Sequence, residues 1–176
     1  MRNIEIKLVR PEQLNRQTLT AILNRAGATF TWERHQRDTF WNTQNGWLKL
    51  REVINESESI QAELIGYRRS AESSDARPSD YHIVEIDQPD ALKAALDSTM
   101  GRKGVVEKQR DLWIWKQTRV HLDEVLGLGS FVELETVLRD IDEPEGRQQM
   151  QECLELLQLN DAEKLAVPYL EMQRTD

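Results

Sequence analysis

The chain has 176 residues, and 23 Lys and Arg against 31 Asp and Glu give it a formal net charge of −8. This length predicts one domain, spanning residues 1–176, with a core that needs no disulfide. The acidic balance argues against a nucleic-acid partner, because such proteins gain affinity by neutralising phosphates. It still allows a local basic pocket for a small anion. Cys153 is the single cysteine, which fits a reducing compartment, so we expect a cytoplasmic protein.

Signals for export, membrane insertion and common cofactor sites are absent from the sequence. The opening segment, MRNIEIKLVR, carries charges within its apolar part, which is unlike a signal peptide. No stretch approaches the roughly 18 apolar residues of a membrane-spanning helix, so no membrane partner is expected. Cysteine-based zinc sites, Walker-type loops and the G-x-G-x-x-G fingerprint are also missing.

In the first half of the chain, alternating apolar and polar residues predict a strand at 3–8. Pro11 is expected to open a helix that ends near Gly27. The next segments, in order, are β-rich residues at 39–41, an Asn45-Gly46 hairpin signal, an alternating strand at 47–53, a strand at 60–69 and a polar loop at 70–79.

The second half continues with short strands and helices. In chain order we expect a strand at 81–86, a helix at 89–100 that ends at Gly101, strands at 105–115 and 118–125, a turn at 127–129, a strand at 131–138, a helix at 144–157 and one or two short helices within 161–172. About eight short strands separated by turn signals are typical of a barrel or a sandwich.

The predicted strands share charged residues placed two apart, with mostly apolar residues between them. Because side chains alternate along a strand, each such pair lies on one face. For any single strand, the simplest interpretation is a charged face in water. If the sheet closes, however, the helices cover its apolar face and the charged face becomes an enclosed lumen.

An enclosed lumen of this kind would hold charges of both signs. The cations are Lys7, Lys49, Arg51, Arg69, Lys108 and Arg110, and the carboxylates are Glu5, Asp123, Glu133 and Glu135. Charges that are buried together must be paired or hold ligands. Such cations suit phosphate oxygens, and carboxylates without His or Cys suit a hard ion, Mg²⁺ or Mn²⁺. The residues therefore predict a polyphosphate–metal site.

Five segments in order resemble the motifs of a known family. They are Asn3-Ile4-Glu5-Ile6-Lys7 for E-x-E-x-K, Gln36-Arg37-Asp38-Thr39-Phe40-Trp41 for Q-x-D-T-Y-F, Leu48-Lys49-Leu50-Arg51 for L-R-x-R, Lys108-Gln109-Arg110 for K-x-R, and the run 121–135, HLDEVLGLGSFVELE, for D-x-V-x-G-L-G-x-F-x-E-x-E. The family is CYTH, the triphosphate tunnel metalloenzymes, and the resemblance covers residues 3 to about 172.

The resemblance implies an α+β fold, in which a closed eight-stranded antiparallel barrel forms a tunnel and helices pack outside. It implies that Mg²⁺ or Mn²⁺ is bound by Glu5, Asp123, Glu133 and Glu135. Phosphate oxygens would be bound by Lys7, Lys49, Arg51, Lys108, Arg110 and, in a strand that aligns less cleanly, Arg69. The expected catalytic residues are Glu5, Lys7, Lys108 and Arg110, with Glu63 a weaker candidate, and Ser79 and Tyr81 belong to the next lumen strand.

Two positions depart from the family pattern. Asn3 stands where the signature has its first glutamate, which removes one carboxylate and leaves the number of metal ions, one or two, open. Lys49 stands where the stricter pattern has arginine, so the charge is kept while the two-pronged geometry of guanidinium is lost.

Two reactions could use the same phosphate-binding and metal-binding residues. If water attacks, the protein is a triphosphatase acting on inorganic tripolyphosphate, a nucleoside triphosphate or thiamine triphosphate. If the ribose 3′-hydroxyl attacks the α-phosphate of ATP, it is an adenylate cyclase of the class IV type. A non-catalytic module that binds polyphosphate or nucleotide is the third possibility, motivated by Asn3. Similar proteins suggest a homodimer. Alanine at Lys108 or Arg110 should abolish turnover and leave the fold intact.

The remaining residues with reactive or aromatic side chains have simpler interpretations. His35, His82 and His121 lack metal-ligand spacing and are expected at the surface or along strands. Trp113 and Trp115 stand one residue out of phase with Lys108 and Arg110, which points them outward onto helices or a partner subunit. Cys153 lies in a helical apolar stripe and is expected to be a core thiol.

Overall fold

The computed structural model describes residues 2–54, 61–69 and 77–173, with the backbone alone for 69 and 77–80. Its strands are β1 (Arg2–Val9), β2 (Thr29–Trp41), β3 (Trp47–Ile54), β4 (Gln61–Arg69), β5 (Arg77–Glu85), β6 (Arg102–Trp115), β7 (Thr118–Val125) and β8 (Gly129–Val137). Its helices are α1 (Arg16–Arg25), α2 (Pro89–Met100), α3 (Glu143–Leu156) and α4 (Tyr169–Met172). The predicted α+β class with eight antiparallel strands is confirmed for the described residues.

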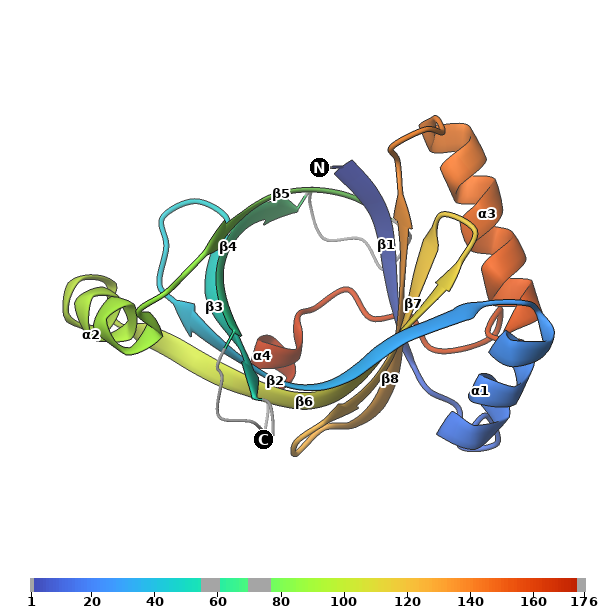
Figure 1. Ribbon diagram of the computed structural model, residues 1–176, viewed down its shortest axis with the longest axis horizontal. Coiled ribbons are helices and arrows are strands. Elements are labelled where there is room, and N and C mark those ends of the chain that lie inside the picture. The colour runs from blue at the N-terminus through green and yellow to red at the C-terminus, as the bar shows by residue number, and fades with distance from the viewer. Residues whose placement is uncertain (1, 55–60, 70–76, 174–176) are drawn as a thin grey trace.

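The strands follow one another around a barrel in the order β1-β5-β4-β3-β2-β6-β7-β8 (Figure 1). Every neighbouring pair is antiparallel. The strand β1 pairs with β8 from Asn3 to Val9 and with β5 from Arg2 to Glu5, so it joins the two ends of the sheet. Side chains of one parity along each strand therefore share the inside of the ring.

The apolar parity of β1, β7 and β8 faces outward, where helices cover it. Figure 1 shows α1 and α3 outside the wall made by β1, β7 and β8, with α2 outside the opposite wall. The main core joins Ile4, Ile6, Leu8, Val120, Val132 and Leu134 of the barrel to Leu19, Leu23, Met150, Cys153 and Leu154 of the helices. Each such side chain stabilises the fold by roughly 1.5–3 kcal/mol when fully buried. Burial of this parity places the polar side chains of β1, β7 and β8 inside the ring.

Trp113 and Cys153 occupy the positions predicted for them. Trp113 belongs to the same core as the residues of α1 and α3, as expected for an outward-facing side chain. Cys153 is fully buried there, and burial raises the pKa of its thiol to about 12. No helix among the described residues combines the length and apolarity needed to cross a membrane.

The boundaries differ from the predictions at the starts of α1 and β5. Pro11 does not open a helix. Its carbonyl accepts from the Leu14 amide, and α1 begins only after Asn15, whose side chain accepts from the Thr18 amide at 2.9 Å. The strand β5 starts at Arg77, inside the predicted loop, because its backbone pairs with β1.

Within the C-terminal part of the chain, 161–172 holds one short helix, α4, in the described structure. The preceding residues follow β1 as an extended segment, with the Val9 amide donating to the Glu163 carbonyl and the Leu165 amide donating to the Lys7 carbonyl. This segment therefore positions α4 at one end of the barrel.

Candidate active site

Inward-facing side chains line two adjoining cavities inside the barrel. The larger has a volume of about 340 Å³ and contains seven predicted site residues, namely Glu5, Lys49, Arg51, Glu63, Arg110, Glu133 and Glu135. The smaller, of about 50 Å³, is lined by several of the same side chains and adds Lys7 and Lys108. Asp123 lines neither cavity, and the side chains of Arg69 and Ser79 lie outside the described part. The barrel thus brings together most of the predicted charges.

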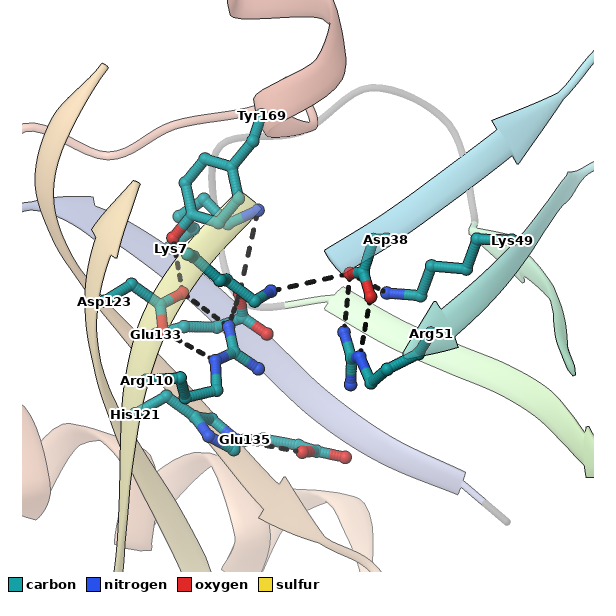
Figure 2. A network of polar contacts seen from close by, with 11 residues as sticks. Lys7, Asp38, Lys49, Arg51, Arg110, His121, Asp123, Glu133, Glu135 and Tyr169 are labelled. Carbon is teal, nitrogen blue, oxygen red and sulfur yellow. Dashed lines mark hydrogen bonds and ion pairs between the residues drawn. The ribbon is translucent and has the colours of Figure 1, made fainter. Parts of the chain in front are cut away.

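Three cations surround the carboxylate of Asp38 on β2. Arg51 donates to it from two nitrogens at 2.8 and 2.7 Å, and the Lys49 ammonium donates at 3.0 Å (Figure 2). The Lys108 ammonium, from β6, lies 3.6 Å away. The side chains of Asp38 and Lys108 are 3% and 4% exposed, and those of Lys49 and Arg51 are 14% and 16% exposed. One negative charge is therefore shared by three enclosed positive charges.

The crowding of these cations shifts the pKa values of Lys49, Lys108 and Asp38. Burial, reinforced by the neighbouring Arg51, lowers the pKa of Lys49 to about 8. Burial and the nearby Arg110 hold the pKa of Lys108 well below its ordinary value. Burial alone would raise the pKa of Asp38, but the three cations outweigh it and hold that pKa well below 3.8. These residues, Asp38, Lys49, Arg51 and Lys108, are here called the Asp38 cluster. Its positive charges outnumber its negative charge, so the cluster would attract a further anion.

The lowered pKa of Lys49 predicts an alkaline loss of anion affinity. Lys49 carries its charge in the folded protein below about pH 8, whereas in the unfolded chain it keeps its proton up to about pH 10.5. The unfolded state thus binds more protons between these values, so stability from this group rises with pH while the positive charge of the site falls. Calorimetric affinity for tripolyphosphate is expected to drop between about pH 7 and pH 9, and less so in Lys49→Arg. Equal drops in both proteins would contradict this assignment.

A second group of contacts centres on Arg110 of β6. Its Nε and Nη2 both donate to the carboxylate of Asp123, and Nη2 also donates to Glu133 at 3.2 Å (Figure 2). The Tyr169 hydroxyl, from α4, donates to the same Asp123 carboxylate at 2.9 Å. The Lys7 ammonium lies 3.7 Å from Glu133 and 3.9 Å from the centre of the Tyr169 ring. Asp123 is completely buried and serves to hold Arg110 in place.

The third group surrounds Glu135 of β8. Its carboxylate accepts from Arg119 at 3.2 Å and from the Asn3 side-chain amide, and it lies 3.4 Å from Nε2 of His121. Burial would raise the pKa of Glu135, but His121 and Arg119 lower it to about 2, so the group is ionised at neutral pH. His121 itself is buried and lines the larger cavity, so it is a strand residue as predicted but not a surface one.

The CYTH domain profile matches residues 1–169. The chain belongs to the CYTH family. No curated protein sequence matches the chain.

Solved structures share the barrel at low sequence identity. PH1012 of Pyrococcus horikoshii OT3 is 18% identical and superposes with a TM-score of 0.78, covering 96% of this chain and 98% of that one. A candidate adenylate cyclase from Vibrio parahaemolyticus is 17% identical, with a TM-score of 0.72 and 98% of each chain covered. The Pct1 RNA triphosphatase of S. pombe is 14% identical, with a TM-score of 0.54 and 89% and 85% covered. These likenesses show the CYTH fold.

Three of the four carboxylates expected to hold a metal line the larger cavity from the neighbouring strands β1 and β8. Glu5, Glu133 and Glu135 all line it, and the buried Oδ1 of Asn3 has no hydrogen-bond partner. Carboxylate and amide oxygens suit Mg²⁺ or Mn²⁺, so the donor chemistry fits. Yet no three His, Cys, Asp or Glu side chains in the described part of the chain are grouped closely enough to hold a metal ion. Glu133 and Glu135 are instead held by cations.

Five residues of this CYTH lumen were missed or undervalued at the level of sequence. They are Arg34, Asp38, Arg119, His121 and Tyr169. Four of them have the parity of predicted strand residues, since Asp38 and Arg34 precede Phe40 by two and six positions, and His121 and Arg119 precede Asp123 by two and four. Arg119 and His121 could have been found by parity within the predicted strand 118–125, whereas Arg34 and Asp38 required the strand at 39–41 to be extended toward the N-terminus. Tyr169 has no such signal, because its place depends on how α4 docks.

Proposed function

We propose that this CYTH protein hydrolyses a triphosphate inside its lumen with the help of Mg²⁺ or Mn²⁺. The observation that supports this most strongly is the Asp38 cluster, in which three enclosed cations share one carboxylate. A buried excess of positive charge is costly unless an anion completes it. A chain of phosphates supplies several negative oxygens at the spacing of neighbouring side chains, and guanidinium groups bind such oxygens through two parallel hydrogen bonds.

In this proposal the cations bind and orient the phosphates. Lys49, Arg51 and Lys108 hold one part of the chain at the Asp38 cluster. Lys7 and Arg110 hold the next part and neutralise the charge that develops as the anhydride bond breaks. The metal would be held by Glu5, Glu133 and Glu135, with Asp123 the remaining predicted ligand. When bound, the metal supplies Lewis acidity and lowers the pKa of water. Glu5 or Glu63 would orient that water.

The adenylate cyclase reaction is the second candidate. It needs the same phosphate and metal sites, and differs in that the ribose 3′-hydroxyl of ATP attacks its own α-phosphate and pyrophosphate leaves. The candidate cyclase from Vibrio parahaemolyticus has the same barrel over 98% of each chain, which is the observation in favour of this reading. A binding module without turnover is the third candidate and is motivated by Asn3.

One experiment separates the three candidates. Purified protein is incubated with tripolyphosphate, ATP or thiamine triphosphate, each with Mg²⁺ or Mn²⁺, and the products are resolved by ion-exchange chromatography. Orthophosphate release is the expected result. Cyclic AMP with pyrophosphate would establish the cyclase instead. Tight tripolyphosphate binding without turnover of any substrate would identify the binding module, and Asn3→Glu would then be the first variant to make.

The pairing of Glu133 and Glu135 with cations predicts that metal and triphosphate bind cooperatively. These carboxylates are held by Arg110, Arg119 and His121. A bound triphosphate would compete for the arginines and release the carboxylates for the metal. Calorimetric titration with Mn²⁺ is therefore expected to show weak binding to the protein alone and at least about tenfold tighter binding with tripolyphosphate present, a coupling of about 1.4 kcal/mol.

The control for this titration measures Mn²⁺ binding to tripolyphosphate without protein, which must be subtracted. A second control replaces Glu135 with Gln, which keeps the shape and removes the charge. Equal Mn²⁺ affinity with and without tripolyphosphate would contradict the coupling.

The cytoplasmic location and the homodimer also stay predictions. Cell fractionation tests the location, and light scattering tests the oligomeric state.

A further inference from the structure

The lysines of the lumen differ in whether a small molecule can reach them. The chain has seven lysines, all within its described residues, and Lys7, Lys49 and Lys108 line the smaller cavity of about 50 Å³. Of these seven, Lys49 is the one that also lines the larger cavity of about 340 Å³. Its side chain is 14% exposed, against 4% for Lys108. A small molecule that enters the larger cavity can therefore touch the Lys49 amine.

The charges around the Lys49 amine favour its neutral form. Nζ donates to Asp38 at 3.0 Å, but Arg51 and Lys108 share that single carboxylate (Figure 2). Arginine keeps its proton in proteins, so a surplus of positive charge in this cluster is relieved by a lysine. Burial, and then the neighbouring Arg51, accordingly lower the pKa of Lys49 to about 8. An amine in its neutral form is a nucleophile.

Lys93 of α2 is exposed to a similar degree but lies in the opposite charge environment. Its side chain is 20% exposed, and its ammonium lies 2.8 Å from Glu52 and 2.9 Å from Asp90. Burial alone would lower the pKa of Lys93, but the hydrogen bonds to these two carboxylates raise it. Lys93 thus has two carboxylate partners, whereas Lys49 shares one carboxylate with two other cations. Comparing these two lysines separates the effect of charge from that of exposure.

We propose that Lys49 is a modification site, which acyl phosphates acylate directly inside the lumen. An acyl phosphate combines a phosphate group, which the cations of the Asp38 cluster attract, with an electrophilic carbonyl carbon. The neutral amine attacks that carbon, a C–N bond forms, and the C–O bond to the phosphate breaks. One amine proton leaves with the phosphate as hydrogen phosphate, so the products are an amide on Lys49 and inorganic phosphate. The step needs no oxidant, reductant or further reactant.

Acylation removes a positive charge from the phosphate-binding part of the lumen. The amide nitrogen of a modified Lys49 is neutral, so it no longer offers a charged donor to a phosphate oxygen. Modified protein is therefore expected to bind tripolyphosphate at least about tenfold more weakly, the usual scale for losing one hydrogen bond from a charged group. Only the attraction of the Asp38 cluster for phosphate is shared with the proposed function, and the acylation itself needs no turnover.

The test is peptide mass spectrometry of the purified protein after timed incubation with acetyl phosphate at neutral pH. An amine with a pKa of about 8 has a neutral fraction about 300-fold above that of an ordinary lysine, and its weaker intrinsic nucleophilicity offsets part of this gain. Lys49 is therefore expected to be acetylated at least about tenfold faster than Lys93. Tripolyphosphate competes for the same cations, so it is expected to slow acetylation of Lys49 and to leave that of Lys93 unchanged.

Lys49→Arg is the matched variant, because it keeps the positive charge and removes the amine. After treatment with acetyl phosphate, the calorimetric affinity for tripolyphosphate should fall in the wild type and stay at its untreated value in Lys49→Arg. Equal acetylation rates at Lys49 and Lys93 would overturn the proposal, and so would acetylation of Lys49 that tripolyphosphate does not slow. Fast acetylation of Lys49 that tripolyphosphate prevents, in a protein that turns over no triphosphate, supports the modification site while the proposed hydrolysis fails.

Discussion

Replacing Lys108 with alanine is expected to lower kcat by roughly 100- to 1,000-fold, the usual cost of removing one preorganised donor to a developing negative charge. Lys108 is 4% exposed and borders both Asp38 and the small cavity, so water cannot substitute for its ammonium. The fold is expected to survive, because Asp38 keeps its contacts with Lys49 and Arg51. The measurement is product release from the best triphosphate substrate together with a thermal melt.

Lys103→Ala is the matched control for Lys108→Ala. Lys103 lies on the same strand, β6, lines neither lumen cavity and contacts the Trp47 ring. The Lys103→Ala protein should retain the activity of the wild type. Normal turnover in Lys108→Ala would show that phosphate binding at the Asp38 cluster is not part of the reaction, and the proposed role of the cluster would then have to be abandoned.

The second large effect is on stability, in the Arg110→Ala protein. Arg110 and Asp123 are 5% and 0% exposed, and removing one member of such a pair leaves an unpaired buried charge that costs about 3–5 kcal/mol. The structure therefore revises the expectation that alanine at Arg110 leaves the fold intact. Urea unfolding followed by tryptophan fluorescence should show the loss. The double variant Arg110→Ala, Asp123→Ala should recover part of it, since the stranded carboxylate is gone.

The comparison between Arg110→Ala and the double variant is informative in either direction. If both lose the same stability, the cost comes from the cavity left by the arginine and not from the stranded charge. If Arg110→Ala is as stable as the wild type, the hydrogen bond from the Tyr169 hydroxyl is enough to stabilise the Asp123 carboxylate. Activity is expected to be absent in both variants, because neither has the guanidinium.

Much of the barrel could be predicted because its strands carry one apolar and one charged face. The strands at 47–53 and 118–125 and the helix at 89–100 agree with β3, β7 and α2 within a residue. Residues 29–38 of β2 were not predicted as a strand. Their inner face carries Arg34, Gln36 and Asp38, and most of their outer face is also polar. Without contrast between the two faces, alternation cannot be seen.

The charged residues that line the lumen were largely predicted, but the contacts between them were not. Period two correctly placed Lys49, Arg51 and Arg110 inside, but it says nothing about which carboxylate each of them contacts. That depends on register across the ring, which brings Asp38 opposite Arg51 and Arg110 opposite Asp123. A register of this kind is fixed by the pairing of whole strands and not by any local motif.

The joining strand β1 has a consequence for how the protein is made. It pairs with β8, and Asn3 is separated in sequence by 132 residues from Glu135, its contact there. Such distant pairings form late, because the entropy of closing a long loop must be lost before any contact compensates it. Lys7 and Glu133 also meet across this seam. A nascent chain that lacks β8 therefore has no assembled site, and refolding is expected to restore ligand binding in a slow final phase, after the helices have formed.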